Sequence, residues 1–242
     1  MLPNVELDAL VLARTAGFVA RAPGFSHPAV PPPLRAGFAF VLARSIAAGL
    51  PAHRTLEGAE LVAALAFEAA VGAAIGIATS MLYDGAYAGG RMLDDYVGIH
   101  VAVPTVGLVA GAGFGRLWSL AFAAAFFVFG GDHVALAAFA DGFRTLPAGA
   151  AVRGAGLETF AVALPATLLR AALLIGGPAV AVSLVVQFSL AAVARVVPRF
   201  STFTLAFPIV FACVLLATLG ALPFVLPLAA RPWFDLRALR AQ

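Results

Sequence analysis

The chain contains no lysine, only one cysteine, and few charged residues of any kind. Charged residues make up 11% of its 242 residues, whereas hydrophobic residues make up 62%. Soluble domains carry about 25% charged residues, so this composition excludes an ordinary water-soluble globule. All fifteen basic residues are arginine, they are scattered along the chain, and the net charge is only +3. No basic stripe is present, so we expect no nucleic-acid partner.

The usual sequence signs of catalysis and metal binding are also missing. Cys213 lies inside an apolar run, has no second cysteine to pair with, and is interpreted as a small core residue. The four histidines are far apart and lack the spacing of metal ligands. No nucleophile elbow of the form Gly-x-Ser-x-Gly is present. We therefore expect no catalytic residue, no metal and no cofactor.

The sequence has long apolar runs instead, interrupted by proline and glycine. One run extends from Phe200 to Ala230 without a charge and includes Pro208 and Pro223. A helix that crosses a bilayer needs about 20 mostly apolar residues, so this run predicts a bent helix at membrane level. The apolar stretches are residues 9–20, 34–50, 61–82, 96–131, 157–194 and 200–230. They predict an all-α, integral membrane-type protein of about six Pro/Gly-kinked segments, forming a single domain over residues 1–242.

The connectors between these stretches are rich in proline and glycine. The prolines from Pro28 to Pro33 cannot continue a helix, and Gly176-Gly177-Pro178 is expected to break the fifth segment. A polar connector is expected at about residues 132–158, and a basic tail at residues 231–242 follows the last apolar run. Trp and Arg in this tail favour anchoring at the membrane–water interface. The N-terminus is acidic, so we expect the first apolar segment to be retained and not removed as a signal peptide.

Several apolar segments nevertheless carry a charge. A charged side chain at the bilayer centre costs roughly 2.5–3.5 kcal/mol even on lenient insertion scales. We therefore expect these segments to be buried against protein in an obligate assembly. The charged residues are Arg14, Arg35, Arg44, Glu68, Arg116 and Arg170.

One charged residue belongs to a pattern with two glycines. Glu68, Gly72 and Gly76 are spaced four apart and share one stripe of a helix. The glycines would let another backbone approach closely. Glu68 is interpreted as a packing residue that pairs with a basic group or caps a neighbouring chain; a proton-relay carboxylate is the alternative. Residues 85–115 are glycine-rich and are expected to be the most flexible region. Within them, Gly111-Ala-Gly-Phe-Gly115 lacks the spacing of a phosphate-binding loop, which favours a mobile or tightly packed apolar loop.

Taken in order, these features resemble the FliR/SctT family of export-gate proteins from flagellar and virulence type III secretion systems. The most specific match is Pro198-Arg-Phe-Ser-Thr-Phe203-Thr-Leu-Ala-Phe207-Pro208, which is similar to the family's Pro-Gln-x-Asn-x-Phe-x-x-Gly-Phe-Pro stretch. Pro31-x-x-x-Arg35-Ala-Gly37 resembles the opening of the family's second helix. The residues that carry the resemblance, and that it implies to be packing or partner contacts, are Pro31, Arg35, Glu68, Gly72, Gly76, Gly90, Gly98, His133, Pro147, Pro198, Phe203, Phe207 and Pro208.

The resemblance implies a non-enzymatic pore component of the bacterial flagellar type III protein export apparatus. Kinked hairpins would form a helical ring with FliP/SctR-type and FliQ/SctS-type membrane proteins, beside a FlhB/SctU-type switch protein. This ring would admit unfolded polypeptides at the bacterial inner membrane, at the flagellar basal body or secretion-system base. A loop at about residues 99–116 would plug the closed pore, and its named residues are Ile99, Val101, Val103, Pro104, Val106, Leu108, Val109 and Phe114.

Other interpretations stay open at this point. The His133 motif favours a flagellar protein, and a virulence-type (injectisome) SctT component is the alternative. A small ion-coupled permease would use Glu68 and Arg170 as intramembrane polar groups and would transport alone. A membrane-embedded enzyme would need clustered polar catalytic groups, and the sequence offers none.

Overall fold

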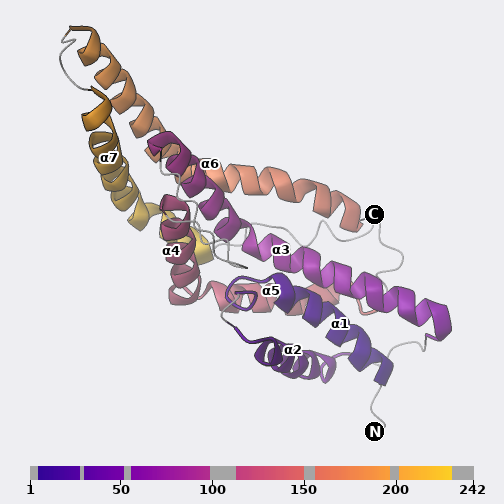
Figure 1. The fold of residues 1–242 in the computed structure, drawn as a ribbon. Coiled ribbons are helices and arrows are strands. Elements are labelled where there is room, and N and C mark those ends of the chain that lie inside the picture. Colours follow the sequence, from indigo (N-terminus) through magenta and orange to yellow (C-terminus); the bar gives the residue numbers. More distant parts are fainter. Residues whose placement is uncertain are drawn as a thin grey trace. The chain divides into compact units, whose positions relative to one another are not determined.

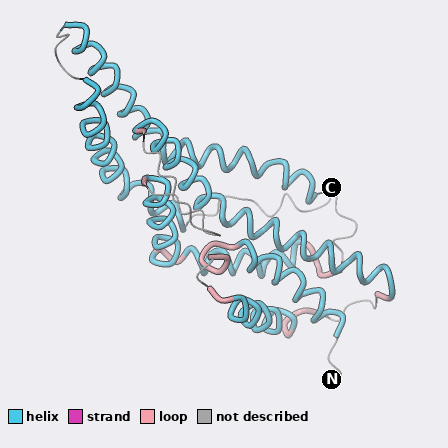
Figure 2. The backbone as a smooth tube through the Cα atoms, in the orientation of Figure 1, coloured by secondary structure: helices cyan, strands magenta, loops and turns pink. Residues whose placement is uncertain are grey.

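The computed structural model describes residues 5–27, 30–51, 56–98, 113–149, 156–196 and 202–230. Within these residues the backbone forms helices and no strand (Figure 2). The expected all-α fold class is therefore confirmed. The elements are α1 (Val5–Arg21), α2 (Pro32–Ala47), α3 (Gly58–Val97), α4 (Phe114–Val128), α5 (Gly131–Thr145), α6 (Gly156–Val196), α7 (Thr202–Val225) and the short 3-10 helix η2 (Leu226–Ala230).

Length and composition identify the helices that can cross a membrane. Three described helices qualify, over Gly58–Val97, Phe160–Val196 and Ala206–Ala229. The number rises to four if α4 and α5 together make one broken span. A bilayer's hydrocarbon core needs about 20 helical residues, so each of the three is long enough to span it.

Proline has two different effects on these helices. The proline-rich connector leads directly into α2. Pro31 is the N-cap of this helix, and prolines also occupy its first helical positions. Proline suits a first helical turn because its missing N–H would have no helical partner there. The break expected at Gly176-Gly177-Pro178 is wrong, because α6 continues through it. In apolar surroundings a break would leave backbone groups without hydrogen bonds, which costs more than the one bond that Pro178 removes.

The segment expected to be a polar connector contains α5. Ala135, Phe139 and Phe143 recur every four residues in this helix and are all buried. That spacing makes one buried apolar stripe on the helix. The charged residues of this helix, Asp132, Asp141 and Arg144, lower the mean hydropathy of the segment without breaking the helix.

The structure divides into two compact units. Unit 1 holds α1, α2, α3 through Met81, α5 and the start of α6 through Ala166. Unit 2 holds α3 from Leu82, α4, α6 from Thr167, α7 and η2. The organisation of residues 1–242 as a single domain stays a prediction.

In unit 1, α1 is the element around which the others gather (Figure 1). Leu10, Val11 and Phe18 of α1 are buried, and Phe18 stacks on Phe139 of α5 with ring centroids 4.3 Å apart. The helix α2 packs beside α1 and buries a narrow stripe of small residues, Ala39, Ala43 and Ala47. The core of unit 1 therefore forms along α1.

In unit 2, α4 supplies the large buried side chains. Trp118 and Phe122 are buried on this helix, and Phe114 lies 5.7 Å from Phe211 of α7 between ring centroids. The helix ends at Val128, and Gly130, two residues later, has a φ of 74°, a conformation that favours glycine. Gly131 follows so close to η2 that a Cβ on it would lie 2.7 Å from the Ala229 carbonyl oxygen.

Candidate functional site

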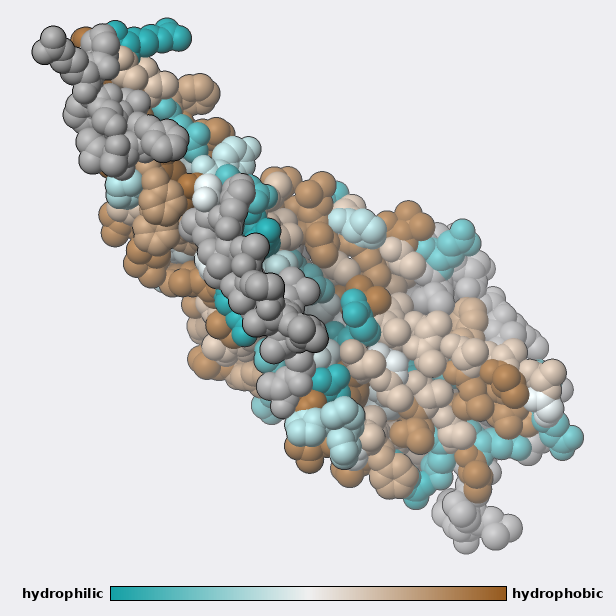
Figure 3. Space-filling model, viewed as in Figure 1, coloured by the Kyte–Doolittle hydropathy of each residue, from teal (hydrophilic) through white to brown (hydrophobic). Residues whose placement is uncertain are grey.

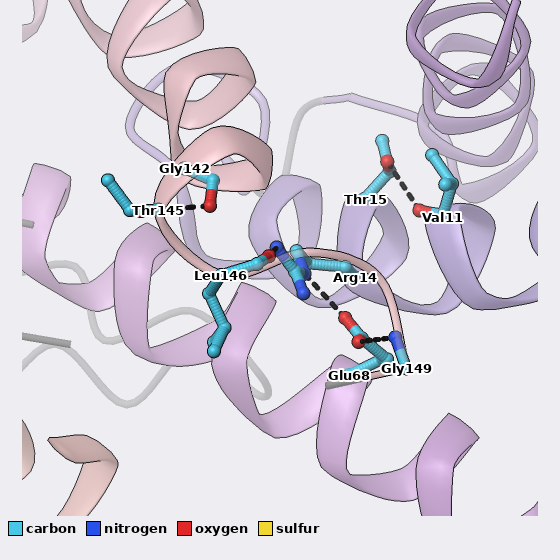
Figure 4. A network of polar contacts seen from close by, with 8 residues as sticks. All are labelled: Val11, Arg14, Thr15, Glu68, Gly142, Thr145, Leu146 and Gly149. Atoms are coloured by element: carbon cyan, nitrogen blue, oxygen red, sulfur yellow. Dashed lines mark hydrogen bonds and ion pairs between the residues drawn. The ribbon is translucent and has the colours of Figure 1, made fainter. Parts of the chain in front are cut away.

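The most strongly polar feature buried in unit 1 is an ion pair between α1 and α3. Arg14 and Glu68 point toward one another (Figure 4), with Nε of Arg14 2.5 Å from Oε2 of Glu68. Neither side chain is exposed to solvent. Two charges taken out of water are tolerated only when each is paired and hydrogen-bonded, so each residue requires the other.

The same pair holds the connector that follows α5. Arg14 Nη1 donates to the Leu146 carbonyl at 2.8 Å, and the Gly149 N–H donates to Glu68 Oε1 at 2.8 Å. The ring of Phe143 lies over the Arg14 guanidinium, 4.2 Å from ring centroid to Cζ. Both carboxylate oxygens of Glu68 therefore have a donor. This geometry favours the pairing interpretation of Glu68 over a proton relay, which needs an oxygen free to exchange protons.

The glycines of the Glu68 stripe lie where α1 crosses α3. A Cβ placed on Gly72 would lie 1.8 Å from the Arg14 carbonyl oxygen, and one on Gly76 would lie 2.6 Å from that of Phe18. On the other helix, a Cβ on Gly17 would lie 2.2 Å from the Ala69 carbonyl oxygen. Helices approach this closely only where side chains are absent. The expected close approach is thus present, and its partner is α1 of the same chain.

In unit 2, a second buried carboxylate accepts backbone hydrogen bonds, at the start of α4. The Asp94 carboxylate, on α3, is buried and accepts the N–H of Phe114 at 2.7 Å and of Gly115 at 3.2 Å. Gly90 packs against the same turn, because a Cβ on it would lie 2.5 Å from the Phe114 carbonyl oxygen. Phe114 itself is buried.

Several predicted contact residues of unit 1 lie at the surface. Arg35 donates to the carbonyls of His27 at 2.7 Å and Val30 at 3.1 Å, and so closes the turn before α2. The imidazole of His133 is exposed and lies 3.2 Å from the Asp132 carboxylate. Pro31 is exposed at the start of α2. Pro147 lines a cleft of about 580 Å³ together with Leu7, Gly49, Leu50, Pro51, Phe143, Arg144 and Ala148.

Other predicted residues are exposed or lie outside the described part of the chain. Gly98 directly follows α3 with a φ of 84°, and Phe207 and Pro208 are exposed on α7. Phe203 belongs to α7, but its side chain is outside the described residues. Also outside the described residues are Ile99, Val101, Val103, Pro104, Val106, Leu108, Val109 and Pro198, so the plug assignment stays a prediction.

The helices of unit 2 expose large apolar side chains. On α6 these include Val185 and Phe188, and on α7 Leu216 and Phe224, which are 69% and 80% exposed. Brown, apolar residues cover much of the face in view in Figure 3. Surfaces this apolar are stable only against lipid or another protein. Among the described residues, no three His, Cys, Asp or Glu side chains are grouped as a metal site requires.

Two residues of these sites were missed by reading the sequence. Arg14 was recognised only as a charge in an apolar segment, and its pairing with Glu68 spans 54 positions. Asp94 was not singled out at all; it lies three residues after Arg91, which offers it a local partner on the same helix. A charge with no local partner in an apolar segment indicates a distant one, and that signal could have identified the pairing of Arg14 but not the contacts of Asp94.

Long apolar helices, buried ionic contacts and glycine-mediated helix crossings define a helical integral membrane protein. The chain belongs to the family described as Bacterial export proteins, family 1, which it matches over residues 7–235. The resemblance to the FliR/SctT family is therefore confirmed, and the chain is a membrane component of a bacterial type III export gate. Comparison with individual curated proteins yields no significant match.

Proposed function

We propose that this chain is a structural pore component of the flagellar type III protein export apparatus. It would form, with FliP-type and FliQ-type partners and beside a FlhB-type switch protein, the channel that admits unfolded export substrates at the inner membrane. The family match over residues 7–235 is the observation that supports an export-gate component, and the flagellar assignment within that family rests on the His133 motif. The function is non-enzymatic and needs no cofactor.

The exposed apolar side chains of α6 and α7 support an assembled protein. Leu216 and Phe224 are among the most exposed large apolar side chains of the described residues. Burial of apolar surface contributes about 25 cal/mol per Å², so covering these faces with partner helices would stabilise a complex. The charges inside apolar segments also support an assembled protein. Arg170, for example, is exposed on α6 and needs a polar partner or water.

Two alternatives make different predictions. The His133 motif favours the flagellar system, and a virulence-type SctT component is the second candidate within the same family. An ion-coupled permease is disfavoured by Glu68, because both of its carboxylate oxygens already accept hydrogen bonds. Such a permease would transport ions after purification and reconstitution without partners, whereas an export-gate subunit would not.

The proposal is tested by co-purifying the tagged chain with its FliP-type and FliQ-type partners in mild detergent. We expect one defined complex by native mass spectrometry and no transport by the chain alone in liposomes. The double variant Leu216→Ala/Phe224→Ala removes exposed side chains, so the isolated chain should keep its thermal stability while the complex dissociates more readily. Truncation of central interface side chains typically costs about 2 kcal/mol or more each.

Val214→Ala is the matched control on the same helix. Val214 is buried in unit 2, so its truncation should lower the stability of the isolated chain instead. A chain that remains monomeric beside its partners and moves ions across vesicles would refute the proposal. An unchanged complex in the double variant would assign this face of α7 to lipid.

A further inference from the structure

One face of α3 in unit 2 is polar, although this helix is long and apolar enough to cross a membrane. The residues of this face recur at the spacing of one helical stripe. We call them the α3 stripe, and they are Asp84, Tyr87, Ala88, Arg91 and Asp95. Asp95 is exposed and the other four are partly exposed. The opposite side of the helix is buried and contains Gly85, Ala86, Gly89 and Leu93. The α3 stripe therefore points away from the core of unit 2.

On another side, α3 packs against α6 along the whole length of the stripe. A Cβ on Gly85 would lie 2.6 Å from the Cβ of Ala171. Further along both helices, Nε2 of Gln187 donates to the Tyr96 carbonyl at 3.0 Å. Because the residue numbers rise together on the two helices, α3 and α6 run parallel and in contact from one end of the stripe to the other.

At the level of the α3 stripe, α6 exposes apolar side chains. Leu173, Leu174 and Val185 are 53%, 49% and 65% exposed. All three lie between the two α6 residues that contact α3. One level of unit 2 therefore has two kinds of surface, which are charged and hydroxyl groups on α3 and apolar groups on α6. Water solvates the first kind readily, whereas lipid or packed protein suits the second.

Lipid is a poor cover for the α3 stripe. A charged side chain at the bilayer centre costs roughly 2.5–3.5 kcal/mol, and the stripe contains Asp84, Arg91 and Asp95. A dry protein partner would have to pair each charge, and pairing only offsets the cost of removing charges from water. Polar residues of membrane-spanning segments characteristically face a bundle interior or a water-filled cavity. The Arg91 side chain fits a wet position, because it is 42% exposed and its Nη1 lies 4.0 Å from Asp94 Oδ2, beyond hydrogen-bonding distance.

We propose that the α3 stripe lines the water-filled conduit of the assembled export gate and contacts the unfolded polypeptide that passes through it. This inference rests on the proposed function, which supplies the conduit and the polypeptide. The stripe has charges of both signs together with the Tyr87 hydroxyl. Such a surface is complementary neither to a strongly acidic nor to a strongly basic segment. It therefore suits a path that polypeptides of many sequences share.

The test uses three matched alanine-to-cysteine variants of the chain, assembled with FliP-type and FliQ-type partners in nanodiscs. Cys213, the only native cysteine, is first replaced by alanine. Ala88→Cys lies in the stripe, Ala86→Cys lies in the core on the opposite side of α3, and Ala181→Cys lies at the exposed surface of α6. The probe is the charged reagent sulfonatoethyl methanethiosulfonate. We expect Ala88→Cys to react at least roughly tenfold faster than the other two, because the reactive thiolate forms in water and not in packed protein or lipid. Asp95→Cys tests a second stripe position.

A second measurement identifies what the stripe contacts. The photo-crosslinking residue p-benzoylphenylalanine replaces Tyr87 in one variant and Phe188 of α6 in the matched control. Phe188 is 74% exposed and belongs to the apolar surface. An export substrate fused to a stably folded domain stalls in the conduit and provides the polypeptide. We expect position 87 to crosslink to the stalled polypeptide, and position 188 to crosslink to partner subunits or lipid instead.

The inference predicts fast labelling at both stripe positions and a crosslink from position 87 to the polypeptide. Slow labelling at both positions in a complex that assembles, or crosslinks from position 87 to partner subunits alone, would overturn it and leave the proposed function intact. Labelling of Ala181→Cys as fast as that of Ala88→Cys would also overturn it, since both surfaces would then meet water. Failure of the unmodified chain to assemble with its partners would instead overturn the proposed function.

Discussion

At the scale of single residues, Arg14 and Glu68 raise the question of how two charges persist inside so apolar a unit. Removing each ion from water costs several kcal/mol, and attraction between them offsets this only with good geometry and further hydrogen bonds. The pair has the Leu146 carbonyl, the Gly149 N–H and the Phe143 ring as additional partners. Within the Arg14 guanidinium, Nη2 finds no acceptor among the described residues. The pair therefore specifies how α1, α3 and the connector fit together more than it adds to stability.

This interpretation predicts a particular mutational pattern. Glu68→Ala leaves the Arg14 charge buried and unpaired, so we expect a loss of about 3–5 kcal/mol in the free energy of unfolding. The double variant Arg14→Met/Glu68→Leu removes both charges and should recover most of that loss. Thermal unfolding of the purified chain in detergent measures both effects.

The pair Arg44–Asp8, between α2 and α1, offers a matched control. Both of its side chains are partly exposed, and surface ion pairs contribute about 0–1 kcal/mol. Arg44→Ala should therefore change the unfolding temperature little. If the double variant at Arg14 and Glu68 is as unstable as Glu68→Ala, the charges themselves are stabilising and the interpretation fails.

At the scale of helices, the crossing of α1 and α3 depends on missing side chains. Gly72→Ala would place a methyl group 1.8 Å from the Arg14 carbonyl oxygen, so the helices must separate and the ion pair must stretch. We expect a destabilisation of about 3 kcal/mol or more, since overpacking a tight contact is costly. Equilibrium unfolding of the purified chain gives the value.

Gly220→Ala is the corresponding change at an open position. Gly220 lies within α7, and a Cβ there would meet nothing within 4 Å. Alanine is favoured over glycine inside a helix by roughly 0.5–1 kcal/mol, so this variant should be neutral or slightly more stable. Equal destabilisation by the two substitutions would mean that Gly72 matters through helix propensity and not through close approach.

The sequence predicted those elements whose signal is local. Continuous apolar runs located α1, α2, α6 and α7, because burial of such runs dominates their energetics. The sequence did not predict α5, because only a narrow stripe of this helix is apolar and buried. It also predicted a break at Gly176-Gly177-Pro178 that the structure does not have. There, Gly176 packs so closely on Gly89 that a Cβ would lie 2.8 Å from its carbonyl oxygen. Tertiary contact of this kind overrides a local preference and has no local signature.

The candidate sites show the same difference between local signals, which the sequence reveals, and distant contacts, which it does not. The stripe of Glu68, Gly72 and Gly76 was predictable from a spacing of four, because that spacing alone defines a helix face. The identity of its partner was not, since Arg14 lies 54 positions away from Glu68. Asp94 likewise accepts a hydrogen bond from a backbone N–H of the next helix, 20 positions away, and no spacing in the sequence indicates this contact. Contacts between distant segments depend on the tertiary fold, which spacing does not encode.

At the scale of the whole molecule, the two units use one device twice. In each, glycines bring two helices into backbone contact, and a buried carboxylate accepts backbone N–H groups from a third segment or from the next helix. Carboxylates are strong acceptors, and they hold the backbone N–H of Gly149 in unit 1 and those of Phe114 and Gly115 in unit 2. Each unit therefore has a fixed internal contact, while large apolar side chains of α6 and α7 remain exposed.

The last prediction concerns the segment that the resemblance assigns to pore closure. Deleting residues 101–109 from the assembled complex should produce ion conductance in the closed state, because the apolar side chains that exclude water would be gone. Replacing Val101, Val103, Val106 and Val109 together by serine should leak as well, whereas replacing the same four by leucine should not. Planar-bilayer recordings of the intact complex, with co-purification confirming assembly of each variant, measure the effect. Equal, low conductance in the deletion, the serine set and the leucine set would show that other residues close the pore, and the closure assignment would then be abandoned while membership of the export gate would stand.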